Sequence, residues 1–262
     1  MNSQLVTAIG LASSPIAVCL TDSKPEGALQ FKEGGWGCVA AAMVGVSKGR
    51  IAAFDRKTFG CPGGGTGLGF GNQYERCHFA IEDLLSTGNP EIAARLQRRS
   101  RMAEGERFLR SPEHVRRWLA TVPFTEVPAD FVVMKPLGLA AEGEEPALVV
   151  FLVTPDQLSA LVCLSDYGRG SGDSVVAKFG GACQSILFGY AEAQRAQPRG
   201  VIGFFDIAQR GRLGRDLLSF TAPYALFREM ESNVTGSFLE MEDWQKLRAR
   251  QDAGDPEPHD RR

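Results

Sequence analysis

Two segments of the chain repeat one pattern, in which a glycine-led cysteine opens a run of small and apolar residues. The first segment, GWGC, ends at Cys38, and the second, GGAC, ends at Cys183. Apolar, strand-like stretches flank both segments, over residues 15–21, 51–55, 146–152 and 201–206. The repeated order predicts two halves related by a pseudo-two-fold axis, with the two cysteines facing each other across it. Chance similarity among segments rich in alanine, glycine and valine is the alternative.

The repeat sets the predicted domain organisation. Strand-like and helix-like stretches are intermixed, so an α/β or α+β fold with a mixed β-sheet is the natural arrangement. We expect one domain over residues 1–247, built of two repeats, 13–80 and 146–232. A charged helical insertion at 81–130 joins the repeats, and the polar residues 248–262 form a disordered tail.

Charge and composition exclude several classes of function. The 262 residues carry 29 basic and 31 acidic side chains, so no excess of cations is available to bind nucleic acid. The arginine-rich stretch 95–117 is interspersed with glutamates and reads as a solvated helical face. The sequence has no secretory signal and no apolar run long enough to span a membrane, so we expect a soluble, cytoplasmic protein. Its six cysteines should then be thiols or metal ligands rather than disulfides.

A glycine-rich segment from Gly60 to Gly71 follows the first repeat and contains Cys61. Glycine loses much conformational entropy in a regular element, so the sequence predicts a loop here. Such a loop could bring backbone N–H groups close to a bulky group, which makes Gly60, Gly63 and Gly64 candidate cofactor-binding residues. A phosphate-binding loop is a weaker alternative, because no Gly-Lys-Ser/Thr ending is present. A plain tight loop is an equally good interpretation.

Three cysteines are the candidate metal ligands. Cys38 and Cys183 each stand at a transition from glycine to helix, where unpaired N–H groups and the helix dipole lower a thiol pKa. Together with Cys61 they would fit an iron–sulfur cluster with one open position, or zinc with a fourth ligand. No CxxC pair supports a metal directly. If the three share a site, their sulfurs should lie within roughly 7 Å of one another.

The remaining candidate residues have plainer interpretations. Cys19 and Cys163 lie in apolar runs and are expected in the core. Cys77, followed by His78, is a spare ligand or an ordinary helix residue. Three histidines without a suitable carboxylate spacing disfavour a hydrolytic triad or an HExxH zinc enzyme. Two aspartates, Asp55 and Asp206, end equivalent stretches and are either acid–base groups or turn and capping residues.

Several motifs resemble a prokaryotic family called domain of unknown function 169, common in anaerobic bacteria and archaea. The matching motifs are Pro15–Val18, Cys38, Cys61–Gly64, Met134–Leu137, Gly181–Cys183, Gln209–Arg212 and Ala222–Tyr224. The resemblance extends over residues 13–230, and the recurring cysteines of that family imply a cluster or metal site. Gly211-Arg212 would take the place of Gly60-Cys61 in the second half. Arg212 would then lie at the rim of an asymmetric site and suit an anionic substrate.

Two functions follow from these observations. The first is a soluble iron–sulfur or metal-binding protein, or an enzyme in which an open coordination position of that site acts on a small anionic substrate. The alternative is a metal-free module with reactive thiols, which binds a small molecule or senses redox state. The expected partners are a small-molecule ligand or an electron-transfer protein, with neither nucleic acid nor membrane, and the chain could form a homo-oligomer.

Overall fold

A seven-stranded mixed sheet forms the centre of the computed structural model, which describes residues 2–77, 80–95 and 101–252. The strands are β1 (Ile16–Thr21), β2 (Ala52–Phe54), β3 (Phe131–Pro136), β4 (Leu148–Val153), β5 (Val175–Ala177), β6 (Gly200–Gly203) and β7 (Leu218–Pro223). They lie in the order β2-β3-β1-β4-β7-β6-β5. All neighbours are antiparallel except β5 and β6, which are parallel. The predicted fold class, with a mixed sheet, is confirmed.

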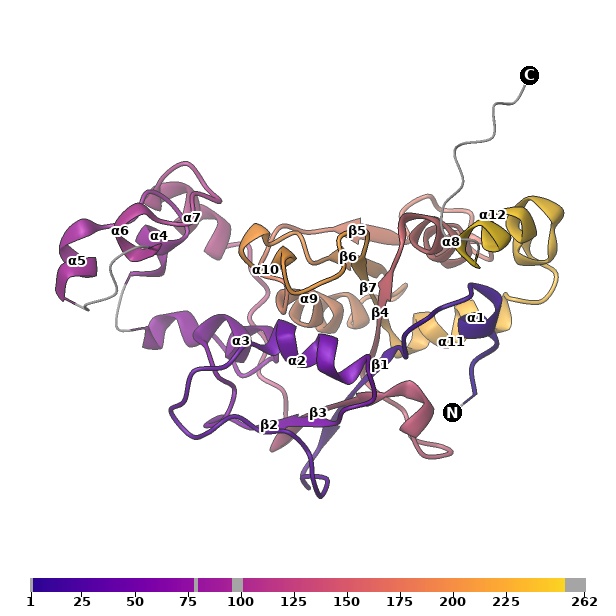
Figure 1. The fold of residues 1–262 in the computed structure, drawn as a ribbon, viewed down its shortest axis with the longest axis horizontal. Coiled ribbons are helices and arrows are strands. Elements are labelled where there is room, and N and C mark those ends of the chain that lie inside the picture. The colour runs from indigo at the N-terminus through magenta and orange to yellow at the C-terminus, as the bar shows by residue number, and fades with distance from the viewer. Residues whose placement is uncertain (1, 78–79, 96–100, 253–262) are drawn as a thin grey trace.

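Helices cover both faces of the sheet (Figure 1). The α-helices are α1 (Gln4–Ala8), α2 (Val39–Val46), α3 (Pro62–Gly67), α4 (Ile81–Leu84), α5 (Pro90–Arg95), α6 (Arg101–Glu104), α7 (Pro112–Leu119), α8 (Pro155–Asp166), α9 (Gln184–Ala193), α10 (Ile207–Arg210), α11 (Tyr224–Ser232) and α12 (Glu242–Asp252). Short 3-10 turns are η1 (Gln73–Arg76), η2 (Leu137–Leu139) and η3 (Phe238–Glu240). Among the described residues, none of these helices has both the length and the apolarity needed to cross a membrane.

Strand alternation divides the core into two layers. Ile16 and Val18 of β1 pack with α2, α3 and α9 on one face. Ala17 and Cys19 point to the other face, where they join α1, α8, α11 and α12. This is the period-two pattern of a sheet buried on both sides. Cys19 is therefore a core residue, as expected, and burial with the nearby Glu144 raises its pKa to about 12.

The two halves of the sheet share one hydrogen-bond register. Ile16 of β1 pairs with Pro136 of β3, and Leu148 of β4 pairs with Pro223 of β7. In each half the outer strand, β2 or β6, pairs with the three residues that lie two, three and four positions before that proline. The halves meet where β1 and β4 pair antiparallel. The matched register is a property of the strand pairing, and the internal repeat and the superposition of the halves about a two-fold axis stay predictions.

The loop predicted for the glycine-rich segment is wrong over Pro62–Gly67, which forms helix α3. Close packing explains why these positions are glycine. A Cβ on Gly65 would lie 2.7 Å from the ring of Phe59, and one on Gly67 would lie 2.7 Å from the carbonyl oxygen of Cys183. Tertiary contact therefore overrides the weak helix propensity of glycine.

Two further expectations need correction. The disordered tail does not begin at 248, because α12 runs to Asp252 and the Arg250 guanidinium donates to Asp156 over 2.7 Å. Residues 253–262 of that predicted tail lie outside the described residues. Cys163 is not in the core either. It lies on the exposed side of α8, because its position falls on the face of that helix turned away from the sheet.

The predicted insertion, 81–130, holds α4 to α7, which form a group beside the main body (Figure 1). Residues 96–100 of this segment lie outside the described residues. Aromatic contacts connect the group to the second half. The Trp118 ring meets Phe179 edge-on, with centroids 5.5 Å apart, and the Trp118 indole donates to the Phe179 carbonyl over 3.2 Å. The insertion is therefore fixed next to the segment that leads into Cys183.

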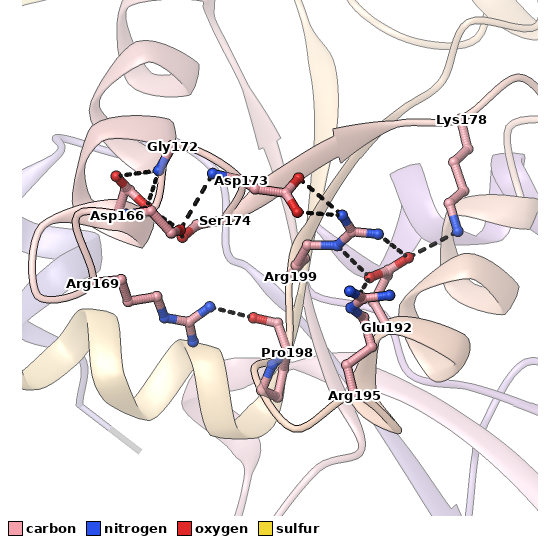
Figure 2. A network of polar contacts seen from close by, with 11 residues as sticks. Asp166, Arg169, Gly172, Asp173, Ser174, Lys178, Glu192, Arg195, Pro198 and Arg199 are labelled. Atoms are coloured by element: carbon pink, nitrogen blue, oxygen red, sulfur yellow. Dashed lines mark hydrogen bonds and ion pairs between the residues drawn. The ribbon is translucent and has the colours of Figure 1, made fainter.

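The far end of α9 is held by ion pairs (Figure 2). Glu192, whose side chain is only 3% exposed, accepts from Lys178 over 2.8 Å and from Arg199 over 2.7 Å. Arg199 also pairs with Asp173, and Arg195 lies 3.5 Å from the same Glu192 carboxylate. Burial alone would raise the pKa of Glu192, but the hydrogen bonds from Arg199 and Lys178 outweigh it and the pKa is lowered. These contacts bind α9 to β5 and β6.

Candidate functional site

Four of the six cysteines line a single cavity of about 230 Å³ on the α2–α3–α9 face of the sheet. They are Cys38, Cys61, Cys77 and Cys183, all half-buried and free of disulfides. The three predicted metal ligands are thus brought to one place, together with the residue that the sequence left as a spare. His78 lies outside the described residues.

Backbone contact brings Cys38 and Cys61 together. The N–H of Cys61 donates to the carbonyl of Gly37 over 3.1 Å, so the two segments that carry these cysteines run side by side. Gly60, which directly precedes Cys61, packs against Gly37 in this contact, and its φ is +81°. A Cβ there would lie 2.6 Å from the Gly37 oxygen, so only glycine permits this approach. Gly60 is accordingly a packing residue that does not line the cavity.

A second set of contacts brings Cys183 to the same place. Its thiol donates to the carbonyl oxygen of Gly63 over 3.2 Å. Near that contact, Gly67 lets the backbone of α3 approach the first residues of α9. Gly63 lines the cavity, whereas Gly64 lies behind it and donates its N–H to the sulfur of Cys61 over 3.3 Å. The glycines therefore act mainly by letting the cysteine-bearing segments meet.

Each of the three predicted ligands stands at the start of a helix. Cys38 is the N-cap of α2 in an extended conformation, and Cys183 is the N-cap of α9 with helical dihedral angles. Neither sulfur makes a capping hydrogen bond. Cys61 is the N-cap of α3 and does accept one, from Gly64. The predicted position of Cys38 and Cys183 at helix N-termini is confirmed.

The predicted lowering of the thiol pKa is wrong for Cys183, and the pKa of two neighbouring thiols is raised as well. Burial raises the pKa of Cys61, against an opposing hydrogen bond from Gly64, and nearby Cys38 raises it further. The pKa of Cys183 is raised by burial and then by the proximity of Cys61 and Cys38. Burial also raises the pKa of Cys77, to about 11. Desolvation and mutual repulsion of the thiolates outweigh the helix termini, so these thiols are protonated at neutral pH in the protein alone.

The side chains do not form a ready-made site for a single ion. Among the described residues, no group of three or more histidine, cysteine, aspartate or glutamate side chains is placed to hold one metal ion. The predicted 7 Å spacing of the three sulfurs stays a prediction. What the arrangement offers is a set of thiols around one cavity, within reach of backbone N–H groups.

Tyr74 and Gln184 belong to the same cavity wall, and the sequence did not single them out. The Tyr74 hydroxyl, which lines the cavity, accepts a hydrogen bond from the Gln184 amide over 2.6 Å. Gln184 is fully buried, and its oxygen accepts from the N–H of Gly181 over 2.7 Å. The only sequence signal for this pair is the glutamine directly after Cys183. The sequence does not show that Tyr74 is its hydrogen-bond partner. The pair fixes the orientation of the tyrosine hydroxyl.

Arg212 is exposed and lines the cavity, which places it at the mouth. Its Nε donates to the side-chain oxygen of Gln209 over 2.6 Å, and the same oxygen accepts from the thiol of Cys38 over 3.2 Å. The expected match of Arg212 with Cys61 stays a prediction. In the second half the residue that caps the helix after the outer strand is Asp206, which accepts from the N–H of Ala208 over 2.9 Å. Arg212 follows that helix.

Both aspartates have the ordinary structural role. Asp206 caps α10, and Asp55 accepts from the N–H groups of Lys57 and Thr58 in the turn after β2. They are not equivalent in the two halves, because the register matches Phe54 with Gly203 and leaves extra residues before Asp206. The match of these two aspartates in sequence is therefore not kept in the sheet.

Comparison with curated proteins and with solved structures gives no match. A family model described as "Uncharacterised ArCR", domain of unknown function 169, matches residues 4–233. This range includes all seven strands and the four cysteines of the cavity. The chain belongs to this family.

Proposed function

We propose that the protein binds an iron–sulfur cluster through Cys38, Cys61 and Cys183 and acts on a small anionic substrate at an open position of that cluster. One observation carries the proposal: three half-buried cysteines, each at a helix N-terminus, line one cavity and are linked by direct backbone contacts. Thiolates are the usual ligands of such clusters. Arg212 at the mouth would attract an anion.

The donor set favours a cluster over zinc. A single zinc ion needs its ligand atoms about 2.0–2.3 Å away, and the described side chains form no such group. A cluster is wider and accepts sulfurs that are farther apart. Thiols bind metal as thiolates, so metal binding must release the thiol protons. The positive charge of the metal then stabilises the buried thiolates. A reducing compartment such as the cytoplasm would keep these free thiols available.

The alternative is a metal-free module that binds a small molecule or senses redox state through the same thiols. The lack of a ready-made metal group among the described residues favours it, since nearby thiols can instead be oxidised in pairs. The two functions use the same cavity and differ in whether metal is present.

Anaerobic purification separates the two functions. We expect brown protein with bound iron and sulfide in similar amounts, measured by absorbance and elemental analysis. Cys38→Ser, Cys61→Ser and Cys183→Ser should each lose most of the iron. Cys163→Ser is the matched control, because Cys163 is exposed on α8 and away from the cavity, and it should keep the full iron content. Colourless protein without iron would reject the cluster and leave the metal-free module, and zinc in its place would point to a structural metal.

A further inference from the structure

The cavity has an apolar side that the cysteines do not explain. The cavity is also lined by side chains from the insertion and from the segment before Cys183, namely Ile81, Leu84, Leu85, Phe108, Trp118 and Phe179. The insertion thus supplies much of the wall of the site instead of standing apart from it. Ligand sites are commonly lined in this way, by apolar and aromatic side chains with a few placed polar groups.

Three aromatic rings of this wall contact one another. Phe179 is met edge-on by two rings of the insertion, Trp118 at 5.5 Å and Phe108 at 6.3 Å between centroids. The hydrogen bond from the Trp118 indole to the Phe179 carbonyl fixes the pair. Phe179 nevertheless remains 38% exposed, so the cluster leaves ring surface uncovered at the cavity. A further flat ring would pack against such surface in the offset or edge-on geometry that aromatic groups prefer.

One cation is available for the polar end of a ligand. The Nε of Arg212 is engaged by Gln209, and its two terminal amino groups make no hydrogen bond to another described residue. A guanidinium with two free N–H edges binds a carboxylate well. Two carboxylates, Glu106 and Asp206, line the same cavity. Their negative charge disfavours a dianion such as phosphate and favours a ligand that carries a single charge.

The volume limits the size of the ligand. A cavity of about 150 Å³ holds a molecule of about the size of benzene, and this one measures about 230 Å³. A single substituted ring is therefore the largest ring system that the cavity admits.

We infer that the cavity binds a monocyclic aromatic carboxylate, with its ring against Phe179 and Trp118 and its carboxylate on Arg212. Treating this ligand as the substrate of the cysteine site rests on the proposed function. Binding itself does not, because the aromatic wall and Arg212 are present whether or not metal is bound.

Calorimetric titration of the full-length protein with four probes tests the inference. Phenylacetate should bind. Phenylacetamide, which lacks the charge, cyclohexylacetate, which lacks the aromatic ring, and inorganic phosphate should each bind at least about tenfold more weakly. No binding of phenylacetate would overturn the inference. Equal binding of phenylacetamide would overturn the role of the charge, and equal binding of cyclohexylacetate would overturn the aromatic class.

Two variants locate the ligand. Arg212→Gln should weaken phenylacetate binding about tenfold. Phe179→Leu should weaken the binding of phenylacetate more than the binding of cyclohexylacetate. Arg215→Gln is the matched control, since Arg215 lies in the same loop, is 93% exposed and does not line the cavity. Unchanged binding in Arg212→Gln, or an equal loss in the control, would overturn the site.

Measuring iron in the same samples separates this inference from the proposed function. Iron-free protein that binds phenylacetate would remove the cluster and keep the aromatic acid site. Brown protein that binds none of the probes would keep the cluster and remove the inference.

Discussion

The two halves of the sheet share one hydrogen-bond register, but the segments that follow their outer strands carry different functional groups. After β2, the first half continues into α3, which Cys61 caps and whose glycines pack against α9. After β6, the second half continues into α10, which Asp206 caps and which leads to Arg212. The first half therefore contributes most of the sulfur, and the second contributes Asp206 and Arg212. Two halves with one strand register can hold an asymmetric site because the loops that follow their outer strands are free to differ.

The two helices that carry the facing cysteines differ in the same way. Helix α2 has no charged residue and packs on the sheet through apolar side chains. Helix α9 carries Glu192, which three basic side chains surround (Figure 2). The second cysteine is thus anchored by ion pairs at the far end of its helix, and the first is not.

The largest effect should come from breaking that anchor. Glu192→Ala leaves Arg199 partly buried with Asp173 as its remaining acidic partner, and we expect a loss of about 3 kcal/mol in unfolding free energy. The measurement is urea unfolding at neutral pH. Glu113→Ala removes an exposed pair with Arg117 and serves as the control, with an expected change below about 0.5 kcal/mol. Equal effects would mean that α9 is held by apolar packing, as α2 is.

The same contact predicts a pH dependence. The pKa of Glu192 is lowered in the folded protein from an ordinary value of 4.5. Its carboxylate therefore adds stability that is fully present above about pH 4.5 and is lost as the pH falls through the lower folded value. The wild type should lose this part of its stability in acid, and Glu192→Ala should show a smaller loss over the same range.

The sequence was informative where local pattern decides the structure. The cysteine-opened helices and the strand order around them are local patterns, and the structure has both Cys38 and Cys183 at N-caps. The α3 helix could not be predicted, because its glycines are explained by tertiary packing, of Gly65 against the Phe59 ring and of Gly67 against Cys183 in the other half. The raised thiol pKa values have the same origin, since burial and neighbouring thiols are properties of the assembled cavity.

Most of the residues that line the cavity could not be predicted from the sequence either. Arg212 is predicted from a match with Cys61 that stays a prediction, and its side chain does line the cavity, whereas Asp206 caps the helix that follows β6. The aromatic wall belongs to a segment that reads only as a charged helical insertion. The apolar residues of this segment form one wall of the cavity only when its helices pack against Phe179, which the sequence does not show.

A second, smaller effect tests the glycine contact between the halves. Gly67→Ala would place a Cβ 2.7 Å from the Cys183 carbonyl oxygen, where backbone on both sides must shift. We expect a loss of about 1–3 kcal/mol in unfolding free energy, as for overpacked sites. Gly211→Ala is the matched control in the other half, because Gly211 has φ −64° and an added Cβ would meet nothing within 4 Å. That change should be neutral or stabilise by about 0.5 kcal/mol. A harmless Gly67→Ala would show that α3 does not hold Cys183 in place.

The smallest effects should separate the two equivalent caps. Asp206→Ala removes the oxygen that accepts from Ala208, and we expect a loss of about 1 kcal/mol. Cys61→Ser keeps an acceptor for the N–H of Gly64, and serine is a preferred N-cap residue, so the stability of the metal-free protein should change by less than about 0.5 kcal/mol. Thermal unfolding of metal-free samples measures both. If Cys61→Ser leaves stability intact while removing bound iron, the sulfur serves the site and not the helix. A loss of stability as large as that of Asp206→Ala, with no change in metal content, would make Cys61 a structural cap and the two halves equivalent at this position.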